Sequence, residues 1–200
     1  MKRTILSLFT LSITLIAVNV LLTSSSRGRA FAANSGNTGA PNEATTCRSC
    51  HGSGFGTTVS ITVMDTAGNS VSDYVPGDTL EVKVDVEYSS GSPSRFGFQI
   101  VSLDGSRTAI NDWIQPSSNT RIASASSRTY AEHNGERSDS SFTAKWVAPA
   151  AGTGSVTFYA GGAAVNNNGG TSGDGGNTAR LSLTENVSTS LAESKLSSDL

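Results

Sequence analysis

Two cysteines and a histidine stand together in the chain at a spacing that suits covalent haem attachment. Both cysteines of the 200-residue chain fall in the run Cys47-Arg48-Ser49-Cys50-His51, which matches the C-x-x-C-H pattern of c-type haem attachment. On one helical turn, residues i and i+3 project to the same side, so each thiol can form a thioether with one haem vinyl group. His51 then follows as the proximal iron ligand. The motif predicts one covalently bound haem c.

A second axial ligand has few candidates in this sequence. His133 is the only other histidine and Met64 is the only internal methionine. His133 ends a strand-like run just before Asn134-Gly135, a two-residue hairpin signal, so we expect it at the rim of a β domain, within reach of a tethered haem. Met64 and an open coordination position are the alternatives. An open position would permit peroxidase or gas-sensing chemistry at the iron.

Two other interpretations of the motif involve no haem. Cys47 and Cys50 can form a disulfide or redox pair in an oxidising compartment, although thioredoxin-like chemistry needs a βαβ context that the surrounding sequence lacks. Zinc can be held by Cys47, Cys50, His51 and His133, which are all the cysteines and histidines of the chain.

Downstream of the motif, the sequence has the alternation that is typical of strands. Val59, Ile61 and Val63 share one face of the first predicted strand, and the stretch from Leu80 to Glu87 alternates apolar and polar residues throughout. Further strands are expected at 95–103, 128–132, 142–147, 155–160 and 178–183. The connections are too short and too rich in glycine for covering helices, so an apolar strand face must be buried against a second sheet. We therefore predict an all-β fold, an immunoglobulin-like or reeler-like antiparallel β-sandwich over residues 57–185, preceded by a short haem-binding segment.

The N-terminus has the pattern of an export signal over residues 1–33. Lys2 and Arg3 precede an apolar stretch, and Ala30-Phe31-Ala32 offers an A-x-A cleavage site, which predicts a mature start near Ala33 or Asn34. An uncleaved membrane anchor is the alternative. We expect residues 34–56 to be an extended linker followed by the haem attachment segment, and residues 186–200 to be a polar tail. The protein is thus expected to be secreted or periplasmic.

Charge and composition narrow the class of partner. Only 15% of residues are charged and the formal net charge is −2, but the predicted signal holds four basic and no acidic residues, so its removal leaves −6. Such a surface disfavours nucleic acid as a partner. The glycine- and asparagine-rich stretch 166–177 has Asp174 as its single acid, too few carboxylates for a calcium site, and is predicted to be a loop.

Several short motifs, taken together, resemble bacterial secreted reeler-like proteins that have a "choice-of-anchor V" domain. The resemblance spans about residues 36–185. It rests on the C-x-x-C-H run and on Thr38-Gly39-Ala40-Pro41, Tyr74-Val75-Pro76-Gly77, Gly97-Phe98-Gln99, Tyr130-Ala131-Glu132-His133, Trp146-Val147-Ala148-Pro149 and Val156-Thr157-Phe158-Tyr159-Ala160.

The resemblance implies a β-sandwich, export, a haem segment ahead of the sandwich, and a histidine at the position of His133. Many such proteins carry a C-terminal anchoring segment, which residues 186–200 lack. The leading hypothesis is a monohaem c-type cytochrome that passes single electrons to partner proteins outside the cytoplasm. The alternative is a non-enzymatic extracellular binding or adhesion module with a Cys47–Cys50 disulfide.

Overall fold

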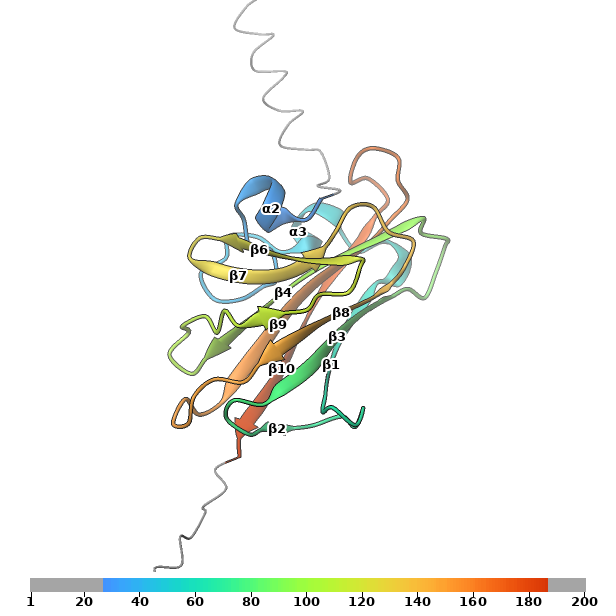
Figure 1. The fold of residues 1–200 in the computed structure, drawn as a ribbon. Helices are drawn as coiled ribbons and strands as arrows, with labels where there is room; N and C mark the ends of the chain where they lie inside the picture. Colours follow the sequence, from blue (N-terminus) through green and yellow to red (C-terminus); the bar gives the residue numbers. More distant parts are fainter. Residues whose placement is uncertain (1–26, 187–200) are drawn as a thin grey trace, which may run out of the picture.

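In residues 27–186, ten strands form two sheets, and these pack face to face (Figure 1). The computed structural model describes residues 27–186, so most of the predicted signal and nearly all of the predicted tail lie outside it. The four-stranded sheet has the order β1 (Thr58–Met64), β3 (Thr79–Glu87), β8 (Ser141–Val147), β5 (Trp113–Ile114). The six-stranded sheet has the order β2 (Asp73–Tyr74), β10 (Gly175–Glu185), β9 (Val156–Val165), β4 (Arg95–Asp104), β7 (Arg128–His133), β6 (Thr120–Ala125).

All pairs in both sheets are antiparallel except the two-residue pairing of β2 with β10. The predicted antiparallel β-sandwich is therefore confirmed. Every strand expected from alternation is present within a few residues, and β9 and β10 are longer than expected because each extends into its glycine-rich end. The strands β2, β5 and β6 were not expected, since two-residue edge strands and the polar run of β6 carry little periodic signal.

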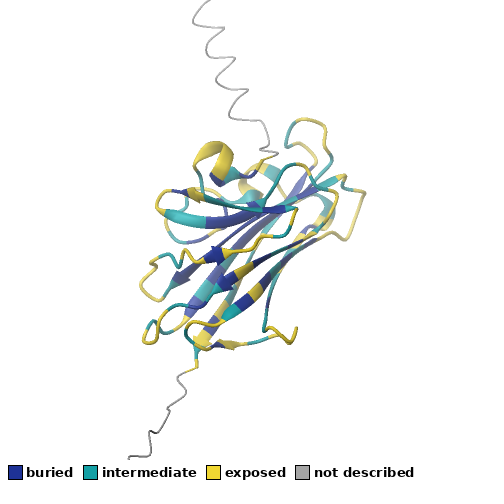
Figure 2. Ribbon diagram, viewed as in Figure 1, coloured by how far each residue is buried: buried dark blue, intermediate teal, exposed yellow. Residues whose placement is uncertain are grey.

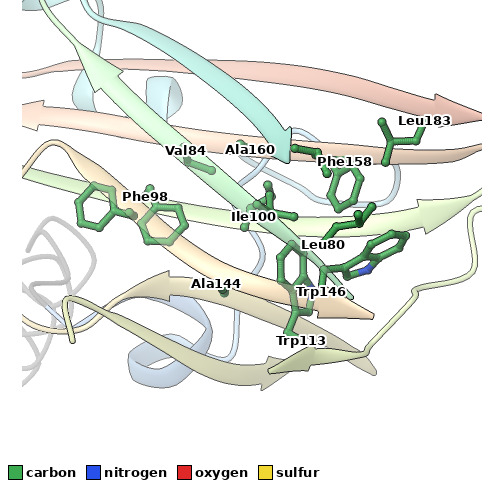
Figure 3. Close-up of a cluster of buried hydrophobic side chains, with 14 of the residues drawn as sticks. Leu80, Val84, Phe98, Ile100, Trp113, Ala144, Trp146, Phe158, Ala160 and Leu183 are labelled. Atoms are coloured by element: carbon green, nitrogen blue, oxygen red, sulfur yellow. The ribbon is translucent and has the colours of Figure 1, made fainter. Parts of the chain in front are cut away.

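The main core lies between the sheets and follows the sequence alternation. Leu80, Val82, Val84 and Val86 of β3 are all buried, whereas the residues between them are exposed or half-buried. Across the gap, the Trp146 ring of β8 meets the Phe158 ring of β9 with centroids 4.9 Å apart. Figure 3 shows both side chains within the core. Figure 2 shows the same buried bands along the strands and exposed residues at the turns. The two sheets are held together by an aromatic and aliphatic interior.

A second, smaller cluster covers the outer face of the six-stranded sheet. Ala30 and Ala40 of the N-terminal segment pack there with Val101, Leu103 and Tyr130, all of them buried. The short helices α2 (Arg29–Ala33) and α3 (Cys47–His51), and the 3-10 turn Gly54–Gly56, belong to this segment. The chain that precedes β1 thus forms an additional layer, which covers part of the outer face of the six-stranded sheet.

One connection differs from the expectation. Asn134-Gly135 was predicted to form a two-residue hairpin, but β7 and β8 lie in different sheets, so this connection crosses from one sheet to the other. That prediction was wrong because a local turn signal does not specify which strand follows in space.

Candidate functional site

The C-x-x-C-H motif forms its own helical turn, α3. Thr46 caps the start of α3: its backbone N–H donates to the Ser49 hydroxyl at 3.0 Å, and the two side chains complete a capping box. Gly52 ends the helix with a positive φ of 64° and donates to the Arg48 carbonyl at 3.0 Å. Residues next to the cysteines therefore set the helical conformation that the motif was expected to have.

Two glycines of the six-stranded sheet let α3 lie directly on the strand backbone. A Cβ on Gly176 of β10 would stand 2.8 Å from the Cys47 carbonyl carbon and oxygen, and one on Gly161 of β9 would stand 2.9 Å from the Cys47 sulfur. Ser53, just after the helix, forms a β-bridge with Gly175. The motif therefore packs closely against β9 and β10.

The segment before the motif is packed as well, which corrects the expectation of an extended linker. Asn37 and Thr38 are buried, and the Asn37 backbone N–H donates to the Gln99 side-chain oxygen at 2.7 Å. The Asn37 carbonyl accepts the Cys47 backbone N–H at 3.1 Å. Polar residues without periodicity were taken for a spacer, but their polar groups are hydrogen-bonded within the segment, above all to Glu43, and to Gln99 of the sheet.

The two thiols differ in environment, and both are free. The Cys47 thiol donates to the Asn37 carbonyl at 3.5 Å, and burial, followed by the nearby Glu43 carboxylate, raises its pKa to about 12. Cys50 is exposed. Thiol exchange requires a thiolate, and redox-active C-x-x-C pairs have a lowered pKa. The raised pKa of Cys47 is the opposite of what a disulfide oxidoreductase needs.

His51 is held by a carboxylate from the far end of the sequence. Its Nδ1 lies 2.9 Å from an Asp174 oxygen, and the side chain of Asp174 is fully buried. The other Asp174 oxygen accepts the Asn166 backbone N–H at 2.9 Å, so the carboxylate is itself fixed. A carboxylate on one ring nitrogen orients the imidazole and makes the other nitrogen a better metal ligand.

Sequence reasoning missed this role of Asp174. The residue was assigned to a long loop, and the structure places it at the end of that loop, immediately before β10 begins at Gly175. A single acid in a stretch of Asn, Gly, Ser and Thr was the available signal. Nothing local connects it to His51, which is 123 positions away.

His133 lies on the same face of the six-stranded sheet as His51, because β7 is irregular at this point. Between the Gln99–Glu132 pair and the Phe96–Arg137 bridge, β4 contributes two residues and the opposite chain contributes four. A bulge of this kind re-aims side chains. The His133 ring lies over Gly97, where a Cβ would stand 3.0 Å from it, and His133 Nδ1 lies 3.2 Å from the Phe98 nitrogen and 3.1 Å from its carbonyl oxygen.

Cys47, His51 and His133 line one pocket on the outer face of the six-stranded sheet. It is a partly open hollow with a cavity volume of about 100 Å³. The small residues Gly97 and Ala163, which pair across β4 and β9, are among the residues that line it. The fold thus gathers three of the four predicted site residues, while the fourth, Cys50, lies on α3 without lining the pocket.

Met64, the alternative axial ligand, is elsewhere. It ends β1, whose other end, Thr58, follows the motif, and six residues of strand span roughly 20 Å. Met64 lines a different hollow, together with Asp65, Glu81 and Lys145. The geometry favours His133 over Met64 as a partner for His51.

The described part of the chain has no cluster of side chains suited to a bare metal ion. Among residues 27–186, no three His, Cys, Asp or Glu side chains gather closely enough to hold a metal ion. In the same range, no helix has the length and apolar character needed to span a membrane.

Comparison with known proteins gives likeness at the level of the fold. No protein-family model and no curated protein sequence matches the chain. Among solved structures, the chain is similar to the human F-spondin reeler domain, with 19% identity over 63% of this chain and 92% of that chain, at a TM-score of 0.42. A second structure of that domain gives 18% identity over 63% and 81% of the two chains, at a TM-score of 0.40.

A cohesin module from a Clostridium perfringens family 33 glycoside hydrolase gives a similar score. It shares 10% identity over 65% of this chain and 98% of that chain, with a TM-score of 0.42. All three TM-scores are below 0.5, so these structures carry no information about the function of this chain.

Proposed function

We propose that this chain is an exported monohaem c-type protein that transfers single electrons outside the cytoplasm. Cys47 and Cys50 would bind the haem covalently, His51 would be the proximal ligand, and His133 the distal ligand. The observation that carries the proposal is the convergence of Cys47, His51 and His133 on one pocket, although His133 is 82 positions beyond His51 in the sequence.

The residues around this pocket suit a flat, largely apolar group with charged edges. Ala163 projects only a methyl group, so a planar ring can approach the sheet there, beside the His133 ring that lies over Gly97. Arg29 and Arg95 also line the pocket and can pair with the two propionate carboxylates of a haem. When bound, haem supplies a one-electron couple whose potential depends on its axial ligands and on the polarity around it.

The protein's part in this function is to position the nitrogen atoms that would bind the iron. Asp174 holds Nδ1 of His51, so this imidazole would bind iron through Nε2, and the backbone of Phe98 orients the His133 ring through its Nδ1. Two imidazole ligands would fill both axial positions, which favours electron transfer over chemistry at an open iron. Electron transfer needs no substrate cavity, and a haem edge at the open side of the pocket would be within reach of a redox partner.

Replacement of His133 with alanine tests the distal ligand. We expect matured His133→Ala protein to keep its covalent haem, because both thioethers remain, and to change from a six-coordinate low-spin to a high-spin absorption spectrum. The measurement is the visible spectrum of the oxidised and reduced protein.

Met64→Leu is the matched control, because Met64 is the other candidate ligand and lies outside the pocket. Its spectrum should equal that of the wild type. A His133→Ala spectrum identical to the wild type, or a high-spin Met64→Leu protein, would show that the ligand assignment is wrong.

Replacement of Asp174 with asparagine tests the support of His51. Loss of the carboxylate makes the imidazole a poorer donor to ferric iron, and second-shell changes of this kind alter metal affinity by at least about tenfold. For a one-electron couple, a tenfold loss of affinity for ferric relative to ferrous iron is about 59 mV. We therefore expect the reduction potential to rise by about that amount or more. Spectroelectrochemical titration measures it.

Asp73→Asn is the control for Asp174→Asn. It makes the same change in charge on an exposed residue of β2, which pairs with the end of β10 remote from Asp174. Equal shifts in the two variants would indicate an effect of net charge rather than of the hydrogen bond to His51.

A further inference from the structure

The N-terminal helix α2 is attached to the sheet through a buried carboxylate. Glu132 of β7 is 0% exposed, and its two oxygens accept the backbone N–H groups of Ala30 at 2.8 Å and Phe31 at 2.9 Å. The remaining donor is the Gln99 side-chain amide at 3.0 Å. Among the described residues, two of the three hydrogen bonds to this carboxylate therefore come from α2.

The carboxylate depends on these donors because no cation in the described part of the chain replaces them. Within residues 27–186, no lysine, arginine or histidine lies within ion-pair distance of Glu132. A buried carboxylate is tolerated only when it is paired or fully hydrogen-bonded. Removing residues 30 and 31 would leave Glu132 with Gln99 as its single described partner.

Side chains of α2 also contact the rest of the fold. Ala30 is buried, and the guanidinium of Arg121 lies 4.4 Å from the centre of the Phe31 ring. Arg29 Nε donates to the Asn37 side-chain oxygen at 3.4 Å. At Gly28, which has a φ of 83°, any Cβ would collide with the Glu132 carboxylate, so the chain enters the site where only glycine fits.

We infer that the exported protein keeps α2, and that signal processing cuts the chain before Arg29. This replaces the cleavage after Ala32 that the A-x-A pattern predicts. Signal cleavage needs small residues one and three positions before the cut. Ser26 and Gly28 meet this need for a cut after Gly28, and Ser24 and Ser26 meet it for a cut after Ser26. The inference rests on export, but it does not depend on the haem.

Retention of α2 also completes the pocket. Arg29 lies in the segment that the sequence assigned to the signal, yet it lines the pocket with Cys47, His51 and His133. A cut after Ala32 would remove this arginine from the mature protein. The position of the cut therefore decides whether the pocket has one arginine or two.

The first experiment identifies the N-terminal residue of the exported protein. The full chain is expressed in a bacterium with an intact export pathway, and the mature product is analysed by intact mass and by mass spectrometry of its N-terminal peptide. A cut chain that starts at Arg29 or upstream of it is expected, whereas an uncut chain or a start at Ala30 or beyond would overturn the inference. If the protein is colourless but starts at Arg29, the haem proposal fails and the inference about cleavage stands.

The second experiment tests the Glu132 contact in the exported protein by amide hydrogen exchange. In Glu132→Gln, one acceptor oxygen becomes an amide that cannot accept, so exchange at Ala30 or Phe31 should be faster by about tenfold or more. Glu87→Gln, an exposed position on β3, is the matched control and should leave both rates unchanged. Unchanged exchange in Glu132→Gln would show that this contact does not hold α2.

Discussion

Serine at both Cys47 and Cys50 is expected to abolish covalent haem attachment. Each thioether needs a sulfur, and the chain has no other cysteine that could replace either one. In a host that assembles c-type cytochromes, wild-type protein should gain the mass of one haem and absorb in the Soret region after denaturation, whereas the double variant should do neither. Intact mass spectrometry and the absorption spectrum of the unfolded protein measure both effects.

The control is Arg48→Ala, which changes an exposed residue between the two cysteines and leaves the attachment pattern intact. It should carry haem as the wild type does. If wild-type protein from such a host instead lacks haem and is lighter by two hydrogens, Cys47 and Cys50 form a disulfide, and the binding or adhesion module becomes the better hypothesis.

Alanine at Gly176 is expected to displace the motif helix from the sheet. Its Cβ would meet the Cys47 carbonyl and the Arg48 Cα at 2.8 to 2.9 Å, and backbone atoms cannot turn aside as a flexible side chain can. Overpacking of this kind lowers the free energy of unfolding by about 1 to 3 kcal/mol. Chemical denaturation of the haem-free protein would measure the loss without the contribution of a bound cofactor.

Gly105→Ala is the matched control, since a Cβ at Gly105 meets no atom within 4 Å and the residue has no positive φ. Its stability should stay within about 0.5 kcal/mol of the wild type, as surface substitutions usually do. In matured protein, Gly176→Ala should also alter the haem spectrum, because His51 moves with α3. If the two variants were equally stable, α3 would not be packed on β10 as described.

The strands and the motif could be predicted because their signals are local. The alternation from Leu80 to Glu87 specifies a strand with one buried face, and all four of its apolar residues are buried in the sandwich. Cys47, Cys50 and His51 are adjacent in sequence, so their relation on one helical turn needed no knowledge of the fold. The capping box around Thr46 and Ser49 is local in the same way.

The pocket could be predicted only in part. His133 was chosen because the chain has one other histidine, and that reasoning led to the residue that lines the pocket with His51. The expected route, a hairpin at Asn134-Gly135, was wrong, because a bulge and a crossing between the sheets put the ring over Gly97. Composition identified the residue, and the packing of β4 against β7 gave it its position.

The sequence by itself determined the class of fold, the attachment motif and the short list of candidate ligands, because periodicity and spacing act over a few residues. Only the tertiary structure decided that Asp174 supports His51, that Gly161 and Gly176 leave room for α3, and that Glu132 holds α2. Each of these contacts joins residues about a hundred positions apart, and it depends on strand register and on the close approach of two backbones. No local pattern encodes which distant residue will fill such a space.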